Sequence, residues 1–131
     1  MSRQIINQTV LTDKAATGVG LTVSVADSQH LILTLATSNS ANCKIKIYGS
    51  AEESSPDFSA AQSVTNIWSP IGIYDLDNGS FSAGSSGIVL TGTDVCKLYE
   101  VNSDGLRWIT VVVTDYTAGK ITAHITQFSN L

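Results

Sequence analysis

Apolar and polar residues alternate with a period of two along most of the chain. Four segments show this alternation most clearly, and their apolar positions are Val19, Leu21, Val23 and Val25; Leu31, Leu33 and Leu35; Cys43, Ile45 and Ile47; and Ile121, Ala123 and Ile125. Because successive side chains of a strand point to opposite faces of a sheet, each segment is expected to be a half-buried antiparallel strand. No segment shows the apolar period of a helix, so the pattern predicts an all-β protein.

Turn-forming residues lie between these and further expected strands. The further strands are expected at 4–11, 71–75, 87–91, 97–101 and 106–116, and the turns at 26–28, 38–40, 77–79, 104–105 and 117–119. Short strands separated by such turns are typical of a sandwich or barrel. The sequence therefore predicts an antiparallel β-sandwich, jelly-roll-like, of about eight to nine short strands. No linker or repeat divides the chain, so residues 1–131 are expected to form a single domain.

One long polar segment, residues 50–66, interrupts the regular spacing of the strands. It contains Pro56 and one large aromatic residue, Phe58. A loop of this length inside a compact domain is usually functional or is packed by its own side chains. We expect Phe58 to anchor the loop to the body of the domain, and Phe58 and the loop are also candidates for contact with a partner subunit.

The strand expected at 106–116 is apolar on both faces. One face carries Ile109, Val111 and Val113, and the other carries Leu106, Trp108 and Val112 among threonines. Such a strand is either central in a two-layer core or covered by a partner subunit. Aromatic residues and arginine are enriched in subunit interfaces, so Trp68, Arg107 and Trp108 are candidate interface residues.

The sequence allows two structural interpretations of the first ten residues. Ile5, Ile6 and Val10 stand there among polar neighbours. The segment is either an N-terminal arm that adds a strand to a neighbouring sheet edge or the first strand of this domain. In the first case Ile5 and Ile6 would contact a partner.

Composition and charge indicate which partners and which cellular location are expected. The 131 residues carry a net charge of −4, and only 14% of them are charged. Seven Lys and Arg residues scattered along the chain make no basic stripe, so nucleic acid is not expected as a partner. No segment has the roughly 18 consecutive apolar residues of a membrane span. Arg3 is not followed by the apolar region of a signal peptide, so synthesis in a cytoplasm is expected.

The stretch YDLDNGS, residues 74–80, has some of the spacing of a calcium-binding loop. Counting from Asp75, however, glycine arrives at the fifth position instead of the sixth, and the twelfth position is Ser86 instead of glutamate. Asn78-Gly79 is the dipeptide that a two-residue type I′ hairpin turn selects. We expect a hairpin tip here, and an irregular cation site formed by Asp75 and Asp77 is the alternative.

No constellation of residues points to catalysis, a metal or a cofactor. Residues 84–87, GSSG, lack the spacing of a nucleophile elbow, and His30 and His124 stand alone. The protein is therefore expected to have no enzymatic activity, no bound metal and no cofactor. Cys43 and Cys96 lie in apolar strand-like segments, so both are expected to be buried free thiols that react slowly.

Two segments, 57–80 and 87–113, resemble small virion structural proteins of tailed bacteriophages. The run EVNSDGLRW, residues 100–108, is part of that likeness. The resemblance implies a capsid decoration (cement) protein with a β-sandwich or jelly-roll fold and no catalytic residues. It also implies a homo-oligomer, with a trimer favoured, that binds the major capsid protein. The protein would be made in the host bacterial cytoplasm and located on the outer capsid surface of the virion.

A glycan-binding module on a tail fibre or another virion surface is the competing hypothesis. Sandwiches of this size often hold sugars on exposed aromatic side chains, and Trp68, Tyr74 and Tyr99 are the candidates. A solvent-exposed aromatic platform would favour this hypothesis. Burial of both tryptophans would count against it.

Overall fold

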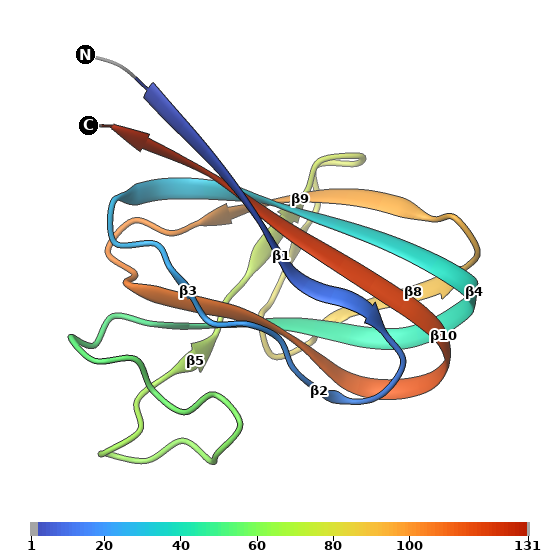
Figure 1. Cartoon of the computed structure of the whole chain (residues 1–131), viewed down its shortest axis with the longest axis horizontal. Helices are drawn as coiled ribbons and strands as arrows, with labels where there is room; N and C mark the ends of the chain where they lie inside the picture. Colours follow the sequence, from blue (N-terminus) through green and yellow to red (C-terminus); the bar gives the residue numbers. More distant parts are fainter. Residues whose placement is uncertain (1–2, 131) are drawn as a thin grey trace.

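The computed structural model describes residues 3–130, and within that range it is all-β, with antiparallel pairing throughout and no helix (Figure 1). The strands are β1 (Arg3–Lys14), β2 (Gly18–Val19), β3 (Val23–Ser24), β4 (Ser28–Ser50), β5 (Ser69–Pro70), β6 (Ile73–Asp75), β7 (Phe81–Ser82), β8 (Ile88–Gly92), β9 (Cys96–Asn102) and β10 (Trp108–Asn130). The predicted all-β, sandwich-like fold is confirmed.

Two long strands, β4 and β10, organise the molecule. Each has 23 residues, and they pair antiparallel from Trp108↔Ser50 to Ser129↔Ser28. Both strands bend at the same level, where Asn39 in β4 and Gly119 in β10 have φ angles of 56° and 82°. The turns predicted at 38–40 and 117–119 were therefore wrong as strand ends. The backbone turns there, but hydrogen bonding between the two strands resumes on either side of the bend.

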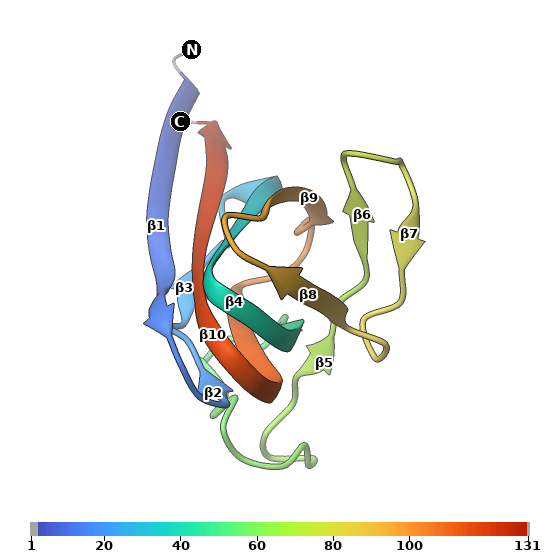
Figure 2. The same cartoon turned by 90° about the vertical axis from the view of Figure 1, so that its right-hand side faces the viewer.

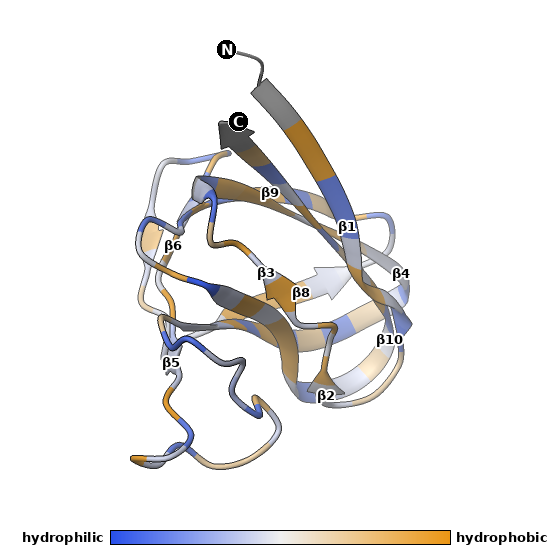
Figure 3. Ribbon diagram, turned by 60° about the vertical axis from the view of Figure 1, so that its left-hand side comes forward, coloured by the Kyte–Doolittle hydropathy of each residue, from blue (hydrophilic) through white to orange (hydrophobic). Residues whose placement is uncertain are grey.

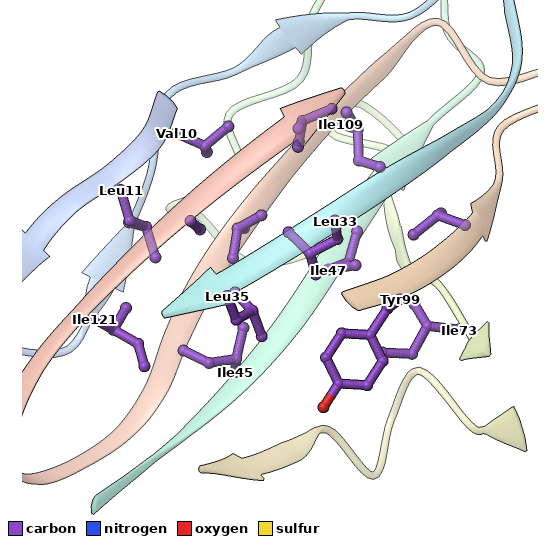
Figure 4. Packing of buried hydrophobic residues seen from close by; sticks show 14 of the residues in the cluster. Val10, Leu11, Leu33, Leu35, Ile45, Ile47, Ile73, Tyr99, Ile109 and Ile121 are labelled. Atoms are coloured by element: carbon purple, nitrogen blue, oxygen red, sulfur yellow. The ribbon is translucent and has the colours of Figure 1, made fainter. Parts of the chain in front are cut away.

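The bend brings the two halves of the β4–β10 ribbon face to face. Leu33 and Leu35 of the first half of β4 lie beside Ile47 and Ile45 of its second half (Figure 4). All four belong to one buried cluster, which also includes residues of β1, β9 and β10. A ribbon folded over itself makes both layers from one continuous sheet, so the core needs no second sheet.

The remaining strands extend the sheet on either side of this ribbon. β1, β2 and β3 pair with β10, whereas β5, β8 and β9 pair with β4. The hairpin of β6 and β7 adds to the far side of β9. Figure 2 shows β1 at one border of the molecule and β6–β7 at the opposite border.

Most of the predicted inward-facing positions are buried, but Leu21 is not. The segment expected as one strand at 19–26 divides into β2 and β3, and the backbone leaves the ladder with β10 at Leu21. The Leu21 N–H donates to the Val10 carbonyl at 3.1 Å, and the Leu21 side chain is 66% exposed. Val23 and Val25 are buried as expected.

Both faces of the first part of β10 are covered by the chain itself. Ile109, Val111 and Val113 are buried on one face, and Thr110 and Val112 are buried on the other. The hydroxyl of Thr110 donates to the carbonyl of Leu21, and Val112 lines a hollow together with Phe58 of the long loop. For these residues the core alternative is correct, because the protein's own β2–β3 segment and loop supply the cover.

Candidate interaction surfaces

The loop between β4 and β5 is anchored by aromatic packing. Phe58 is buried and lies with its ring centre 6.3 Å from that of Trp68. Trp68 in turn stacks on Tyr48 of β4, with ring centres 4.2 Å apart and an interplanar angle of 24°. The indole N–H of Trp68 donates to the Ala60 carbonyl at 3.2 Å. The predicted anchor role of Phe58 fits this arrangement. The domain itself buries the Phe58 side chain, and its contact with a partner subunit stays a prediction.

Hydrogen bonds inside the loop give it a defined shape. The Asn66 side chain accepts from the Asp57 N–H and donates to the Asp57 carbonyl, both at 2.8 Å, and also donates to the Ala61 carbonyl at 3.1 Å. The Asp57 carboxylate accepts from the hydroxyl and the N–H of Ser59, and these bonds lower the pKa of Asp57. Because these hydrogen bonds join residues within the loop, the loop presents a preformed surface.

Two other predicted interface residues flank the start of this loop. Trp108 is half-buried, and its indole N–H donates to the Glu52 carbonyl at 3.0 Å. The Arg107 backbone is held between Ser50 and Val25, while its side chain is exposed. The structure thus ties both tryptophans to the loop and leaves Arg107 at the surface.

The remaining predicted interface residues lie in β1. Residues 3–10 pair with β10 as the first strand of this domain, and residues 1–2 lie outside the described range. The Ile5 side chain is 63% exposed and that of Ile6 is half-buried. In Figure 1 the N-terminal part of β1 and the long loop lie at opposite ends of the molecule.

The three aromatic candidates for a glycan platform have different environments. Tyr99 is 3% exposed, so its candidacy was wrong. Its strand register explains this result, because Tyr99 pairs with the buried Leu33 and therefore faces the core. Tyr74 is half-exposed and packs on Phe81 at a tilt of 55°, whereas Trp68 is partly covered by Tyr48.

An exposed apolar patch that sequence reasoning missed lies across β7, β6 and β9. Tyr74 pairs with Phe81, and the Leu76 N–H donates to the Leu98 carbonyl at 3.1 Å. Strand alternation places Tyr74, Phe81 and Leu98 on the outer face of the sheet, opposite the buried Ile73, and Leu76 directly follows β6 beside Leu98. These four side chains are 47–58% exposed. No local pattern marks this patch, because it forms only when the hairpin pairs with β9.

The stretch YDLDNGS forms the predicted hairpin tip, but the turn is longer than two residues. The Asp75 N–H donates to the Ser80 carbonyl at 2.9 Å, and the Gly79 N–H donates to the Asp75 carbonyl at 2.7 Å. Of Asn78 and Gly79, only Gly79 has a positive φ, of 73°. The type I′ turn was therefore wrong. The Asn78 side chain bonds to Ser80 and caps the wider loop.

An ammonium group lies between the two carboxylates that formed the alternative cation site. Lys97 Nζ is 3.0 Å from an Asp75 oxygen and 3.6 Å from an Asp77 oxygen. The hydrogen bond with Lys97 lowers the pKa of Asp75, and the same bond with Asp75 raises the pKa of Lys97. Residues 3–130 contain no group of His, Cys, Asp and Glu side chains able to hold a metal ion. The absence of a bound metal stays a prediction.

The two cysteines are free thiols, but only one of them is buried. Cys43 belongs to the core cluster, and burial raises the pKa of its thiol. Cys96 is exposed, so its predicted burial was wrong. The residues of β9 that face the core are Lys97, Tyr99 and Val101, which places Cys96 on the outer face.

Two solved structures share this fold. The SPBc2 prophage-derived protein YomS matches with a TM-score of 0.71 and 13% sequence identity, over 98% of this chain and 96% of YomS. The PBSX exported protein XepA matches with a TM-score of 0.73 and 15% identity, over 98% of this chain and 39% of XepA. This chain thus spans well under half of XepA. No protein-family model matches the sequence, and no curated protein matches it.

A helix able to cross a membrane is not found within residues 3–130.

Proposed function

We propose that the protein is a bacteriophage virion structural protein without enzymatic activity, and specifically a capsid decoration (cement) protein that stabilises the head. The likeness to the prophage-derived YomS carries the proposal, because the two folds agree over nearly the full length of both chains. It agrees with the sequence resemblance of residues 57–80 and 87–113 to small virion proteins. The major capsid protein is the proposed partner, on the outer surface of the particle.

The architecture suits a mechanical role. β4 and β10 hold each other along their full length, and the core continues through the bend without a break between layers. Such a domain transmits load through paired backbone instead of through loops. The apolar patch of Tyr74, Leu76, Phe81 and Leu98 supports contact with another protein surface, since exposed apolar patches of this kind often mark interaction sites.

Many weak contacts would suffice for this role. An interface of standard size buries about 800 Å² per partner. Several copies bridging neighbouring capsid subunits would slow dissociation far more than one contact does, because rebinding is intramolecular. A closed oligomer on the shell would provide such multivalency, and the resemblance implies that this oligomer is a trimer.

The test is made on particles. Virions assembled with and without this protein are purified, examined by cryo-electron microscopy for density on the head, and heated in steps while release of DNA is followed. We expect head density only when the protein is present, together with release of DNA at a higher temperature. Virions that contain the protein only in the tail, or heads that survive heat equally with and without it, would refute the decoration role.

A glycan-binding module remains the second candidate because of one observation. The Tyr48–Trp68 stack is half-exposed beside the hollow formed with Phe58, Val19 and Val112. Binding of host-cell polysaccharides, measured by glycan array and lost in Trp68→Ala, would favour this candidate. Equal array signals for the wild type and Trp68→Ala would remove the observation on which it depends.

A further inference from the structure

The outer edge of β1 is free along most of its length. Within residues 3–130, β1 pairs with β10 on one side. On its other side the Leu21 N–H donates to the Val10 carbonyl, and this bond limits the free border at residue 10. Residues 3–9 therefore have a border without a neighbouring strand, which Figure 2 shows at the margin of the molecule. Alternate residues of such a strand direct their N–H and C=O groups outward.

This edge lacks the features that normally prevent pairing with another strand. Residues 4–12 contain no charged residue, no proline and no glycine. The bulges of β1 begin only after Thr9, so the preceding residues form a regular ladder with β10. Ile5 is 63% exposed, and Figure 3 shows a hydrophobic stretch in the N-terminal half of β1. Natural proteins usually protect long edges with charges, proline or bulges.

We infer that two copies of the chain pair antiparallel through residues 3–9 of β1. Among the described residues the free stretch runs from Arg3, where β1 begins, to Thr9, next to the bonded Val10, and Ile6 lies at its middle. Full overlap of two such stretches places Ile6 of one copy opposite Ile6 of the partner subunit. Ile5 then lies opposite Asn7 of the partner subunit, and the sheets of the two copies become continuous.

Three properties of the edge identify a second copy as the occupant. An antiparallel strand edge is complementary to itself, so one two-fold contact satisfies both copies and closes the assembly. The chain carries a net charge of −4, but residues 4–9 are uncharged, and Arg3 at the end of the stretch falls opposite Thr9 of the partner subunit, so two copies meet there without opposing like charges. Full overlap of the seven residues of the free stretch with the same seven residues of a second copy also gives the contact a defined register.

The inference is independent of the proposed capsid role, since it concerns the protein alone in solution. A two-fold contact gives a dimer and differs in this respect from the trimer that the resemblance implies. The mass in solution separates the two forms directly. A failure of the particle experiments would leave this contact standing, and a monomer in solution would leave the capsid role standing.

The first experiment measures mass by multi-angle light scattering and sedimentation over a range of concentrations. The wild-type protein is expected to form a dimer at micromolar concentration. Asn7→Lys puts a charge on each side of the two-fold axis at an exposed position, and it should weaken dimerisation at least tenfold. Val89→Lys, at an exposed position of β8, is the matched control and should leave the dimer intact. A wild-type monomer, or an oligomer that Asn7→Lys does not weaken, would overturn the inference.

The second experiment tests the register by disulfide formation in a Cys96→Ser background. Ile6→Cys should give a covalent dimer under mild oxidation, because the two substituted positions lie opposite each other. Gln8→Cys is the control: its two copies would be offset by four residues, roughly 13 Å along the strands, which is beyond the reach of a disulfide. Circular dichroism confirms that both variants fold. Cross-linking through position 8 and not through position 6 would refute the proposed pairing.

Discussion

Gly119 of β10 and Ala41 of β4 meet backbone to backbone at the bend of the central ribbon. A Cβ atom on Gly119 would lie 2.3 Å from the Ala41 Cα and 2.6 Å from its nitrogen. Gly119 also has a φ of 82°, a conformation that residues with a side chain rarely adopt. The bend that joins the two layers therefore depends on the absence of one methyl group.

Gly119→Ala is expected to destabilise the fold strongly. The left-handed conformation costs about 1–2 kcal/mol for alanine, and forcing a methyl group against backbone atoms adds about 1–3 kcal/mol. The free energy of unfolding, measured by urea denaturation, should fall by about 2–5 kcal/mol. Gly79→Ala is the matched control, since Gly79 has a φ of 73° but no atom within 4 Å of the added Cβ. Its expected cost is about 1 kcal/mol, and equal losses in the two variants would contradict the role of close packing.

The sequence predicted the strands well because alternation is a local signal. Leu31, Leu33 and Leu35 are buried as the period of two requires, and so are Ile121 and Ile125. The sequence could not show in the same way that the strands expected on either side of residues 38–40 and 117–119 are continuous. Turn-forming residues report local backbone angles, whereas the continuation of a ladder through a bend depends on a partner about 80 residues away.

The surfaces were harder to predict for the same reason. Alternation in β9 correctly separates Tyr99 from Cys96 and Leu98, but it does not show which set faces the core. The pairing of Tyr99 with the buried Leu33 decides this. Leu21 is exposed because its backbone leaves the ladder, which no property of the residue itself indicates.

Removal of the Phe58 side chain should release the long loop. Phe58 is buried against Trp68, and truncation of a buried phenylalanine costs about 3–5 kcal/mol. We expect the loss of stability in Phe58→Ala to lie near the lower value. The variant should also become sensitive to proteinase K within residues 51–67, and mass spectrometry identifies the sites of cleavage. Val64→Ala changes a side chain that is 91% exposed in the same loop and should alter neither property. Unchanged resistance to the protease in Phe58→Ala would show that the loop is held by its hydrogen bonds instead.

The Lys97–Asp75 pair should make stability depend on pH at both ends of the scale. The pKa of Asp75 is lowered in the folded state, so its contribution is present above its unfolded value of about 3.9 and is lost as the pH falls through the folded value. The pKa of Lys97 is raised, so its contribution is present below about 10.4 and is lost as the pH rises through the folded value.

The unfolding temperature of Asp75→Asn should therefore lie below that of the wild type near neutral pH and approach it in acid. Asp77→Asn is the control with the same loss of charge. Asp77 is 3.6 Å from Lys97 and 82% exposed, so a smaller effect is expected. A constant difference between Asp75→Asn and the wild type from pH 2 to pH 7 would show that the carboxylate acts through something other than its charge.

The two thiols should differ sharply in reactivity. A thiolate is the reactive form of cysteine, and it needs both access and ionisation. Cys43 is buried and its pKa is raised by burial, whereas Cys96 lies exposed at the start of β9. In native buffer a chromogenic disulfide reagent should therefore label one thiol per chain rapidly. Cys96→Ser should abolish that fast phase, and denaturant should expose the second thiol in the wild type.

Because the reaction of Cys43 requires the core to open, its labelling rate should follow the stability of the fold, and Gly119→Ala should accelerate it. Fast labelling that persists in Cys96→Ser would mean that the core around Cys43 opens readily in the native state.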